Sequence, residues 1–428
     1  MKFDIVLSGV SYLSQASKRM LEEPYGDIMR GIYSSLNGKH NHHVSILYNS
    51  FAEKNQGPLF EEVFKNQDQR IYADSGGLQM ITLGKEIDAE AKKSIYQNQA
   101  DFSDFAMSFD EIPVVTTGKS GIGDVSNRFF DRAGIESKAR QTGRNLKDQI
   151  AYFDAQNTKS KPMLILQGNS LESTQLWLDC VCDELGSENF HMISGVASAL
   201  SSMGSGTLED FERAFIVNHL KYPEGINYKH MHLLGIGSLT KLVPIVLLAR
   251  DNDMMISYDS TKITGNFQRG CYYYKGDFRY TRVGNTGSKK FDKFYDDIVQ
   301  NLDELSLNTM KENFDYDIFF KKFINGKEWT SEGLGAEDRL RDFNLASAYL
   351  IAQTHNFIAD LAKVCYDDNH MENFYGVYPY FRAPCIAFAE VRDEQDMIDW
   401  RTMHNMHWKK RIKSKALKEL EQTGATLV

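Results

Sequence analysis

The sequence predicts an α/β protein whose core is a (β/α)8 TIM barrel, followed by a mostly helical C-terminal extension. Short apolar runs alternate with longer stretches of helical spacing over the first 260 residues. Polar residues and glycines follow most of these runs, at the places where the expected strands end. With 428 residues, 42% of them hydrophobic, the chain is long enough to bury a large core.

The alternation gives eight strands with helices between them, which is the count of this barrel. The expected strands are Phe3–Leu7, Val44–Tyr48, Arg70–Ala73, Phe105–Phe109, Pro162–Leu166, Phe190–Ile193, Met231–Leu234 and Met254–Tyr258. The expected helices include Pro58–Asn66, Ile87–Gln99, Asn127–Phe153, Leu171–Leu185, Leu208–His219 and Leu239–Ala249. We place the barrel in residues 1–285 and a helical region packed on it in residues 286–428. Within that region, residues 315–342 are a charged helical appendage of unassigned role.

Composition excludes several classes of protein. No apolar run approaches the ~18 residues of a membrane span, and residues 1–4 begin a strand rather than a secretory signal. We therefore expect a cytoplasmic protein without a membrane segment. The five cysteines are few and scattered, which favours reduced thiols. The net charge of −9 argues against a uniformly basic nucleic-acid binder.

Polar groups gather at the expected strand ends. In a TIM barrel the C-terminal ends of the strands open onto one face, where the chemistry of the fold resides. A single carboxylate there is equally well explained as the N-cap of the next helix, whereas a converging set is not. The set is Asp74-Ser75-Gly76-Gly77, Asp110-Glu111, Gln167-Gly168, Gly195-Val196-Ala197, Leu234-Gly235-Ile236-Gly237 and Asp259.

These elements resemble, in their order along the chain, the motifs of the tRNA-guanine transglycosylases. A later run, residues 348–356, resembles the Thr/Ser-His-Asn helix of that family through Thr354-His355-Asn356. The resemblance covers roughly residues 68–365. The family exchanges a guanine base in a nucleic acid for a 7-deazaguanine on a (β/α)8 barrel. It therefore implies a pentosyltransferase that uses free guanine and a free 7-deazaguanine base.

The resemblance also implies roles for individual residues. Exchange with retention needs two displacements through a covalent glycosyl-enzyme, in which one carboxylate attacks and another carries the proton. By resemblance Asp259 is the nucleophile and Asp74 the general acid and base. Asp110 reads the base edge. The remaining base-binding positions implied by the match are Gln167, Gly168, Gly195, Val196, Ser75, Leu78, Leu234 and Gly235.

Departures from the family pattern point to a particular branch. The family's zinc site needs three cysteines after the nucleophile and a later histidine, but Cys271 is the one cysteine in that region. One thiol cannot make a tetrahedral site, so we predict no zinc of the usual kind and no other cofactor. Leu78 and Leu234 replace the usual stacking aromatic and covering methionine. These differences favour the phage and bacterial 7-deazaguanine DNA transglycosylases, with a preQ0-type (7-cyano) base as the incoming substrate and DNA as the polymer. A phage-encoded protein would act in the host cytoplasm.

Two segments depart from the acidic average. Residues 261–290 carry seven Lys or Arg against one Asp, and residues 401–418 carry seven against none. Basic patches with interleaved aromatics suit nucleic-acid binding, although a solvated basic helix explains residues 401–418 almost as well. The candidate nucleic-acid contacts are Lys262, Tyr272, Tyr273, Lys275, Arg279, Arg282, Lys409, Lys410 and Arg411.

Other interpretations stay open from sequence alone. The chain is either a DNA base-exchange enzyme, a tRNA transglycosylase without the usual zinc site, or a non-catalytic subunit of the same fold. Retention of both Asp74 and Asp259 argues against the last. The His40–His43 cluster is either a metal site or, more in keeping with its position, a polar loop before the second strand. Monomer and homodimer are both open.

Overall fold

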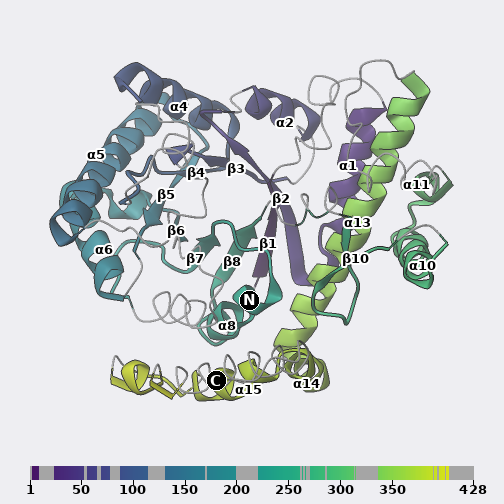
Figure 1. Cartoon of the computed structure of the whole chain (residues 1–428). Coiled ribbons are helices and arrows are strands. Elements are labelled where there is room, and N and C mark those ends of the chain that lie inside the picture. Colours follow the sequence, from purple (N-terminus) through teal and green to yellow (C-terminus); the bar gives the residue numbers. More distant parts are fainter. Residues whose placement is uncertain are drawn as a thin grey trace, which may run out of the picture.

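Eight parallel strands close into a barrel in sequence order, each paired with the strands before and after it, and β1 paired with β8. The structure, a computed structural model, describes residues 2–8, 24–52, 55–64, 69–77, 87–113, 131–168, 171–198, 220–260, 263, 266, 270–284, 287–312, 314, 336–388, 390–392, 395–400 and 402–403. Figure 1 shows the ring of strands with helices around it. The predicted (β/α)8 barrel with a helical extension is confirmed.

The bounds of the elements follow the predicted alternation. The barrel strands are β1 Lys2–Leu7, β2 His42–Asn49, β3 Ile71–Asp74, β4 Phe105–Met107, β5 Lys161–Leu166, β6 Gly195–Ser198, β7 His230–Leu233 and β8 Met255–Asp259. The helices between them are α1 Tyr25–Leu36, η2 Lys39–Asn41, α2 Gln56–Phe64, α4 Ala89–Phe102, α5 Arg132–Gln156, α6 Leu171–Leu185, η4 Ser187–Met192 and α8 Leu239–Asp251. After the barrel come β9 Cys271–Tyr273, β10 Tyr280–Arg282, α10 Lys289–Glu304, α11 Asn308–Glu312, α13 Ala336–Tyr366, α14 Asp368–Val377 and α15 Pro379–Phe388.

Local chemistry accounts for several of these boundaries. The side chain of Asp88 accepts a hydrogen bond from Ala91 N at the start of α4, and Asp131 accepts one from Gly134 N at the start of α5. Such caps satisfy backbone donors that the first helical turn leaves free. The strands are short and almost wholly buried, because helices cover their outer face and side chains fill the barrel.

The long helix α13 completes the ring. It contacts α1 and α8, and Figure 1 shows it beside α1 with α10 and α11 beyond it. It therefore occupies the place of the helix that would follow β8 in a regular barrel. One apolar cluster runs from the outer face of the strands into α13, with residues such as Tyr258 and Phe357 packed together. The division at residue 285 stays a prediction.

One predicted strand is wrong. The run Phe190–Ile193 lies in η4 and the turn after it, and β6 begins two residues later at Gly195. Its apolar side chains pack on the outer core instead of forming a ladder, while the small residues of β6 fit the barrel wall. The other seven strands lie within two residues of their expected limits. The predicted helix Leu208–His219 lies outside the described residues.

The histidine cluster is only partly a loop. His40 lies in η2, whereas His42 and His43 begin β2, and His42 stacks on Phe3 with 4.7 Å between ring centroids. Among the described residues, no helix is long and apolar enough to cross a membrane. All five cysteines are free thiols. Cys271 is partly exposed, and the other four are buried.

Candidate active site

The carboxylate of Asp74 ends β3 and is held by the neighbouring strand. Asn49 lies opposite Asp74 in the register of β2 and β3, and its Nδ2 donates to Asp74 Oδ2 at 3.1 Å. The amide of Asn49 is fixed in that orientation because its Oδ1 accepts from Phe51 N and Ala52 N at 3.0 and 2.8 Å. Asn49 therefore presents a donor to Asp74.

The carboxylate of Asp259 ends β8 and is 7% exposed. Its Oδ1 accepts from Gly235 N at 3.0 Å and lies 3.4 Å from Nε2 of the buried His232. Burial raises the pKa of Asp74 to about 6, and the negative charge of Asp259 adds to that rise. The charge of Asp259 thus acts on the protonation of Asp74 across the barrel. Near neutral pH a carboxyl with this pKa is protonated in a fraction of the molecules, the form that an acid beside a nucleophile needs.

A third carboxylate, Asp110, lies against the double-glycine turn. It is 6% exposed, and Gln167 Nε2 donates to its Oδ2 at 2.6 Å. Burial raises the pKa of Asp110 to about 7, with the hydrogen bond from Gln167 opposing the rise and the charge of Asp74 adding to it. A Cβ at Gly77 would stand 2.7 Å from Asp110 Oδ1, so only glycine fits there. The structure thus brings Asp74, Asp110 and Gln167 to one mouth.

Several buried polar atoms near the strand ends have no hydrogen-bond partner among the described residues, Nε2 of His232 being one. Two others are Gln167 Oε1 and the hydroxyl of Ser75, which is fully buried. Buried polar groups in folded proteins are nearly always paired, so atoms of this kind are suited to a ligand's polar edge. A planar molecule with several hydrogen-bonding groups on one edge would satisfy both these atoms and Asp110.

The other predicted base-binding residues are not all at the mouth. Gly195 and Val196 form the start of β6, opposite Met163 and Leu164 within β5, so their predicted place beside the base is wrong; a Cβ at Gly195 would meet His230 O at 2.8 Å. Gly168 follows β5 and packs on Thr174. Leu234 packs on the apolar cluster inside the barrel. Leu78 and Lys262 lie outside the described residues, as do Lys409, Lys410 and Arg411.

Sequence reasoning missed Asn49, His230 and His232. The alternation in His230-Met231-His232 was the available signal, because residues two apart in a strand point to the same face. Both histidines are buried, and both contact the hydroxyl of Ser257, His230 through Nε2 at 3.2 Å and His232 through Nδ1 at 2.9 Å. They point into the barrel, where apolar side chains are the rule.

The prediction that Tyr272 and Tyr273 contact nucleic acid is contradicted by their burial. They are 0% and 1% exposed, because the hairpin β9–β10 packs its tyrosines on α13. The hydroxyl of Tyr272 donates to Asp297 Oδ2 at 2.7 Å, and that of Tyr273 donates to Asp360 Oδ2 at 2.8 Å. A ring enclosed in this way has no face free for a base.

The basic residues of the hairpin remain exposed, but its tip turns toward the helices. Lys275 lies close enough to His40 to help lower the pKa of that imidazole, after burial as the main cause. His40 immediately precedes β2, so Lys275 belongs to the amino end of that strand and not to the mouth. Phe278 packs on His370 and the tip thus faces α14. Arg282 pairs with Cys271 at the open end of the hairpin.

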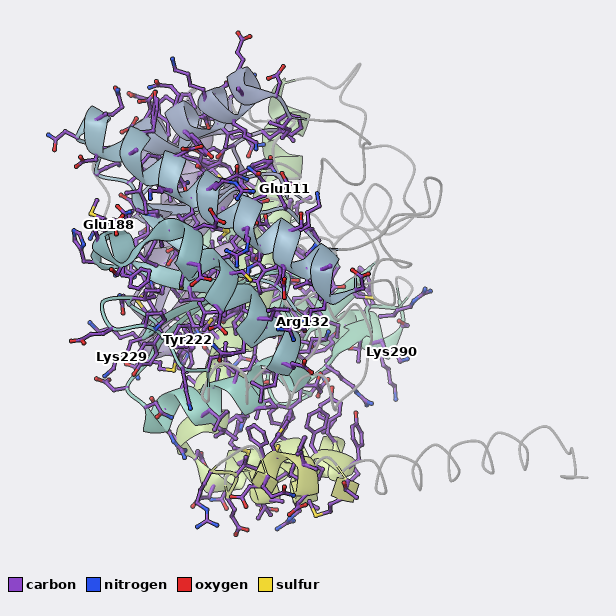
Figure 2. All side chains as sticks on the ribbon, turned by 90° about the vertical axis from the view of Figure 1, so that its left-hand side faces the viewer. Glu111, Arg132, Glu188, Tyr222, Lys229 and Lys290 are labelled. Carbon is purple, nitrogen blue, oxygen red and sulfur yellow. The ribbon has the colours of Figure 1, made fainter. Side chains whose placement is uncertain are left out.

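Figure 2 separates the labelled residues at the two ends of the barrel. Glu188, Tyr222 and Lys229 precede β6 and β7 and lie toward its left side. Arg132 and Lys290 lie toward the opposite side. Since Arg132 begins the helix that follows β4, this is the side of the C-terminal strand ends. Lys290 is exposed there, beside Lys289 at the start of α10.

The described residues near Cys271 do not form a cluster of metal ligands. Within the described parts of the chain, no group of three or more His, Cys, Asp or Glu could hold a metal ion. His355 instead faces His40, with 3.3 Å between their Nε2 atoms, and its Nδ1 contacts Asn301 Oδ1 at 2.8 Å. His370 pairs with Asp360 at 3.1 Å. A network of tyrosines and carboxylates therefore fixes the hairpin to α13 here.

The sequence matches no protein-family model, and a search of curated proteins gives no significant match.

Proposed function

We propose that this protein is a base-exchange enzyme that replaces guanine in DNA with a 7-deazaguanine through a covalent glycosyl-aspartate intermediate. The observation that carries the proposal is the pair Asp74 and Asp259, buried carboxylates at the ends of β3 and β8, where burial and then the charge of Asp259 raise the pKa of Asp74. Two coupled carboxylates, one protonated and one ionised, are the groups that glycosidic exchange with retention requires.

In the first displacement Asp259 attacks C1′ of the target nucleotide. The Oδ2–C1′ bond forms as the bond from C1′ to the base nitrogen N9 breaks. Protonated Asp74 gives its proton to the departing guanine, which leaves as the neutral base, and Asp74 becomes the carboxylate. The pKa of about 6 keeps a useful fraction of Asp74 protonated near neutral pH.

In the second displacement a 7-deazaguanine takes the place of guanine. Asp74 accepts the proton from N9 of the incoming base while that nitrogen attacks C1′, and Asp259 leaves as a carboxylate. Asp74 ends the cycle protonated, as it began, so the exchange needs no other proton source. The donor Asn49 Nδ2 stabilises Asp74 in the ionised form that exists between the two steps.

Base recognition falls to Asp110 and Gln167. A guanine-type base presents N1–H and an exocyclic amine side by side, and these two donors suit one carboxylate. Ionised Asp110 can accept both donors. Gln167 Nε2 donates to Asp110 Oδ2, and the Oε1 of Gln167, which has no partner among the described residues, is an acceptor available to the base. Gly77 allows the carboxylate and a flat base to approach the turn closely. The target base has to leave its stack to reach this depth.

DNA is the polymer that we favour. The departures in sequence from the tRNA enzymes are concentrated in the segment after Asp259, where a hydrogen-bonded hairpin stands in place of the zinc ligands. Exposed cations on the side of the C-terminal strand ends, among them Lys290 at the start of α10, suit the phosphates on either side of a flipped nucleotide.

Incubation with radiolabelled guanine tests the function directly. The protein should label duplex DNA in a reaction that Asp259→Ala abolishes, and wild type without an acceptor base should form a denaturant-stable adduct with DNA. Label in total tRNA but not in DNA would support the tRNA enzyme instead. Absence of label in both polymers and of any adduct would overturn base exchange.

A further inference from the structure

We propose that His232 is a positioning residue for the nucleophile: its Nε2–H holds Oδ1 of Asp259, directs Oδ2 toward the sugar and stabilises the carboxylate as it leaves in the second displacement. The inference rests on the proposed function and extends it to a residue that carries no motif in the sequence. It starts from the contacts of Asp259. Oδ1 accepts a hydrogen bond from Gly235 N at 3.0 Å, and His232 Nε2, which has no hydrogen-bond partner among the described residues, lies 3.4 Å from the same oxygen.

The groups around His232 place a proton on Nε2. Its Nδ1 contacts the hydroxyl of Ser257 at 2.9 Å, and its Nε2 faces a carboxylate oxygen. A lone pair on Nε2 would repel that oxygen, so Nε2 carries the proton in either form of the ring. In the neutral form Ser257 donates to Nδ1, and in the imidazolium form Ser257 accepts from it.

The ring has no freedom to turn away from Asp259. His232 is 0% exposed, and the ring of Tyr72 stacks on it with 5.2 Å between centroids and 27° between planes. The contacts continue inward, from Ser257 to His230 at 3.2 Å, from His230 to the hydroxyl of Tyr72 at 3.4 Å, and from that hydroxyl to Asp4 at 2.9 Å. A continuous chain of polar contacts, from Ser257 to Asp4, therefore holds the imidazole in place on the side away from Asp259.

The chemical consequence follows from which oxygen is held. In the glycosyl-aspartate, Oδ2 is bonded to C1′ and Oδ1 is the ester carbonyl oxygen. When the Oδ2–C1′ bond breaks, negative charge returns to Oδ1, to which Gly235 N already donates and beside which His232 Nε2 lies. Donors that are in place before charge develops lower the barrier to that step. Removal of one donor should slow departure of Asp259 and leave more enzyme in the covalent form.

Two amide variants separate this role from simple packing. In His232→Gln the side-chain amide reaches roughly as far as Nε2 and can still donate to Asp259. In His232→Asn the shorter amide reaches Ser257 only. We expect His232→Asn to lower kcat about tenfold with KM for the free base little changed, and to raise the fraction of enzyme trapped as DNA adduct during turnover. His232→Gln should recover part of both effects.

A spectroscopic measurement tests the contact without any substrate. In the full chain labelled with ¹⁵N-histidine, the ring nitrogens of His232, assigned by their loss in His232→Asn, should shift when Asp259 becomes Asn. The signals of His370, which pairs with Asp360, serve as the control and should stay. The titratable groups that face His232 are Asp259, Asp74, Tyr72, His230 and, through the polar chain, Asp4.

The outcomes distinguish the positioning role of His232 from the proposed base exchange. If Asp259→Asn leaves the His232 signals unchanged, or if His232→Gln and His232→Asn lose activity equally without adduct accumulation, the positioning role is wrong while base exchange can stand. If the signals respond but no polymer is labelled by wild type, the His232–Asp259 contact stands and the proposed function fails.

Discussion

Replacement of Asp74 with asparagine should make the protein more stable at alkaline pH while it destroys activity. The pKa of Asp74 is raised from 3.8 to about 6 in the folded chain, chiefly by burial and then by the charge of Asp259. The folded state therefore favours the protonated form. The contribution of this group to stability is complete below pH 3.8 and is lost as the pH rises through 6. Asparagine stays neutral and avoids that loss.

The magnitude follows from the shift. A rise of about 2 units corresponds to about 3 kcal/mol, because each unit is worth roughly 1.4 kcal/mol. Urea unfolding at pH 8 should thus give Asp74→Asn a free energy of unfolding up to about 3 kcal/mol above wild type, and at pH 4 a difference under about 1 kcal/mol. Exchange activity should fall by roughly 10²–10⁴-fold, because an amide cannot carry the proton.

A second variant shows whether Asp259 is part of the cause. In an Asp259→Asn background the charge that raises the pKa of Asp74 is gone, so the stabilisation by Asp74→Asn at pH 8 should be smaller. An equal effect of Asp74→Asn at pH 4 and pH 8 would refute the raised pKa. An equal effect in both backgrounds would refute the coupling on which the proposed function depends.

Four further predictions concern the base, the polymer, the hairpin and metal. Affinity for free guanine should rise as the pH increases through about 7, where Asp110 ionises, and Asp110→Ala should abolish this binding in calorimetry while DNA binding persists. Lys290→Glu should lower the slope of log K against log salt for DNA by roughly one unit or more, whereas Lys229→Glu, on the opposite side of the barrel, should not change it. Asp360→Ala should destabilise the protein by about 1–3 kcal/mol in urea, because it leaves the buried hydroxyl of Tyr273 and the N–H of Gly276 without their acceptor. Chelators should leave the thermal midpoint unchanged.

A specific result would contradict each of these four predictions. Base binding that ignores pH between 6 and 8 would separate Asp110 from base recognition, since its pKa of about 7 lies in that range. Equal salt slopes for the two lysine variants would move the DNA path away from the mouth. A stable Asp360→Ala protein would mean that the hairpin docks through its apolar contacts alone, and tightly held stoichiometric zinc would show ligands beyond the described residues.

The strand ends could be predicted because they depend on local patterns. Runs such as Lys161–Leu166 are apolar over their whole length, as strands buried on both faces are, and Asp74 and Asp259 follow such runs directly. The sixth strand was misplaced for the same reason: Phe190–Ile193 is more apolar than Gly195–Ser198, and hydrophobicity alone does not tell a buried turn from a short strand of small residues.

Features that depend on distant partners could not be predicted in this way. The role of Asn49 is set by its register opposite Asp74, and that of His232 by a serine and an aspartate on the next strand. Tyr272 and Tyr273 follow the nucleophile among basic residues, which in sequence suggests an exposed surface. Their hydroxyls are buried because α13, whose described part begins at Ala336, supplies Asp360 and covers them.

The closure of β1 onto β8 determines when the site can form. Val6 and Asp259 are partners in register, although almost the entire barrel separates them in sequence. The loop that this pairing closes is long, and contacts of such high sequence separation form late and slowly in folding. The strand that carries Asp259 reaches its final neighbour only when the ring closes, and the helix that seals this seam, α13, comes later still in the chain. A growing chain therefore cannot bring Asp74 and Asp259 together until all eight barrel strands have been made, and cannot seal that seam until α13 has followed.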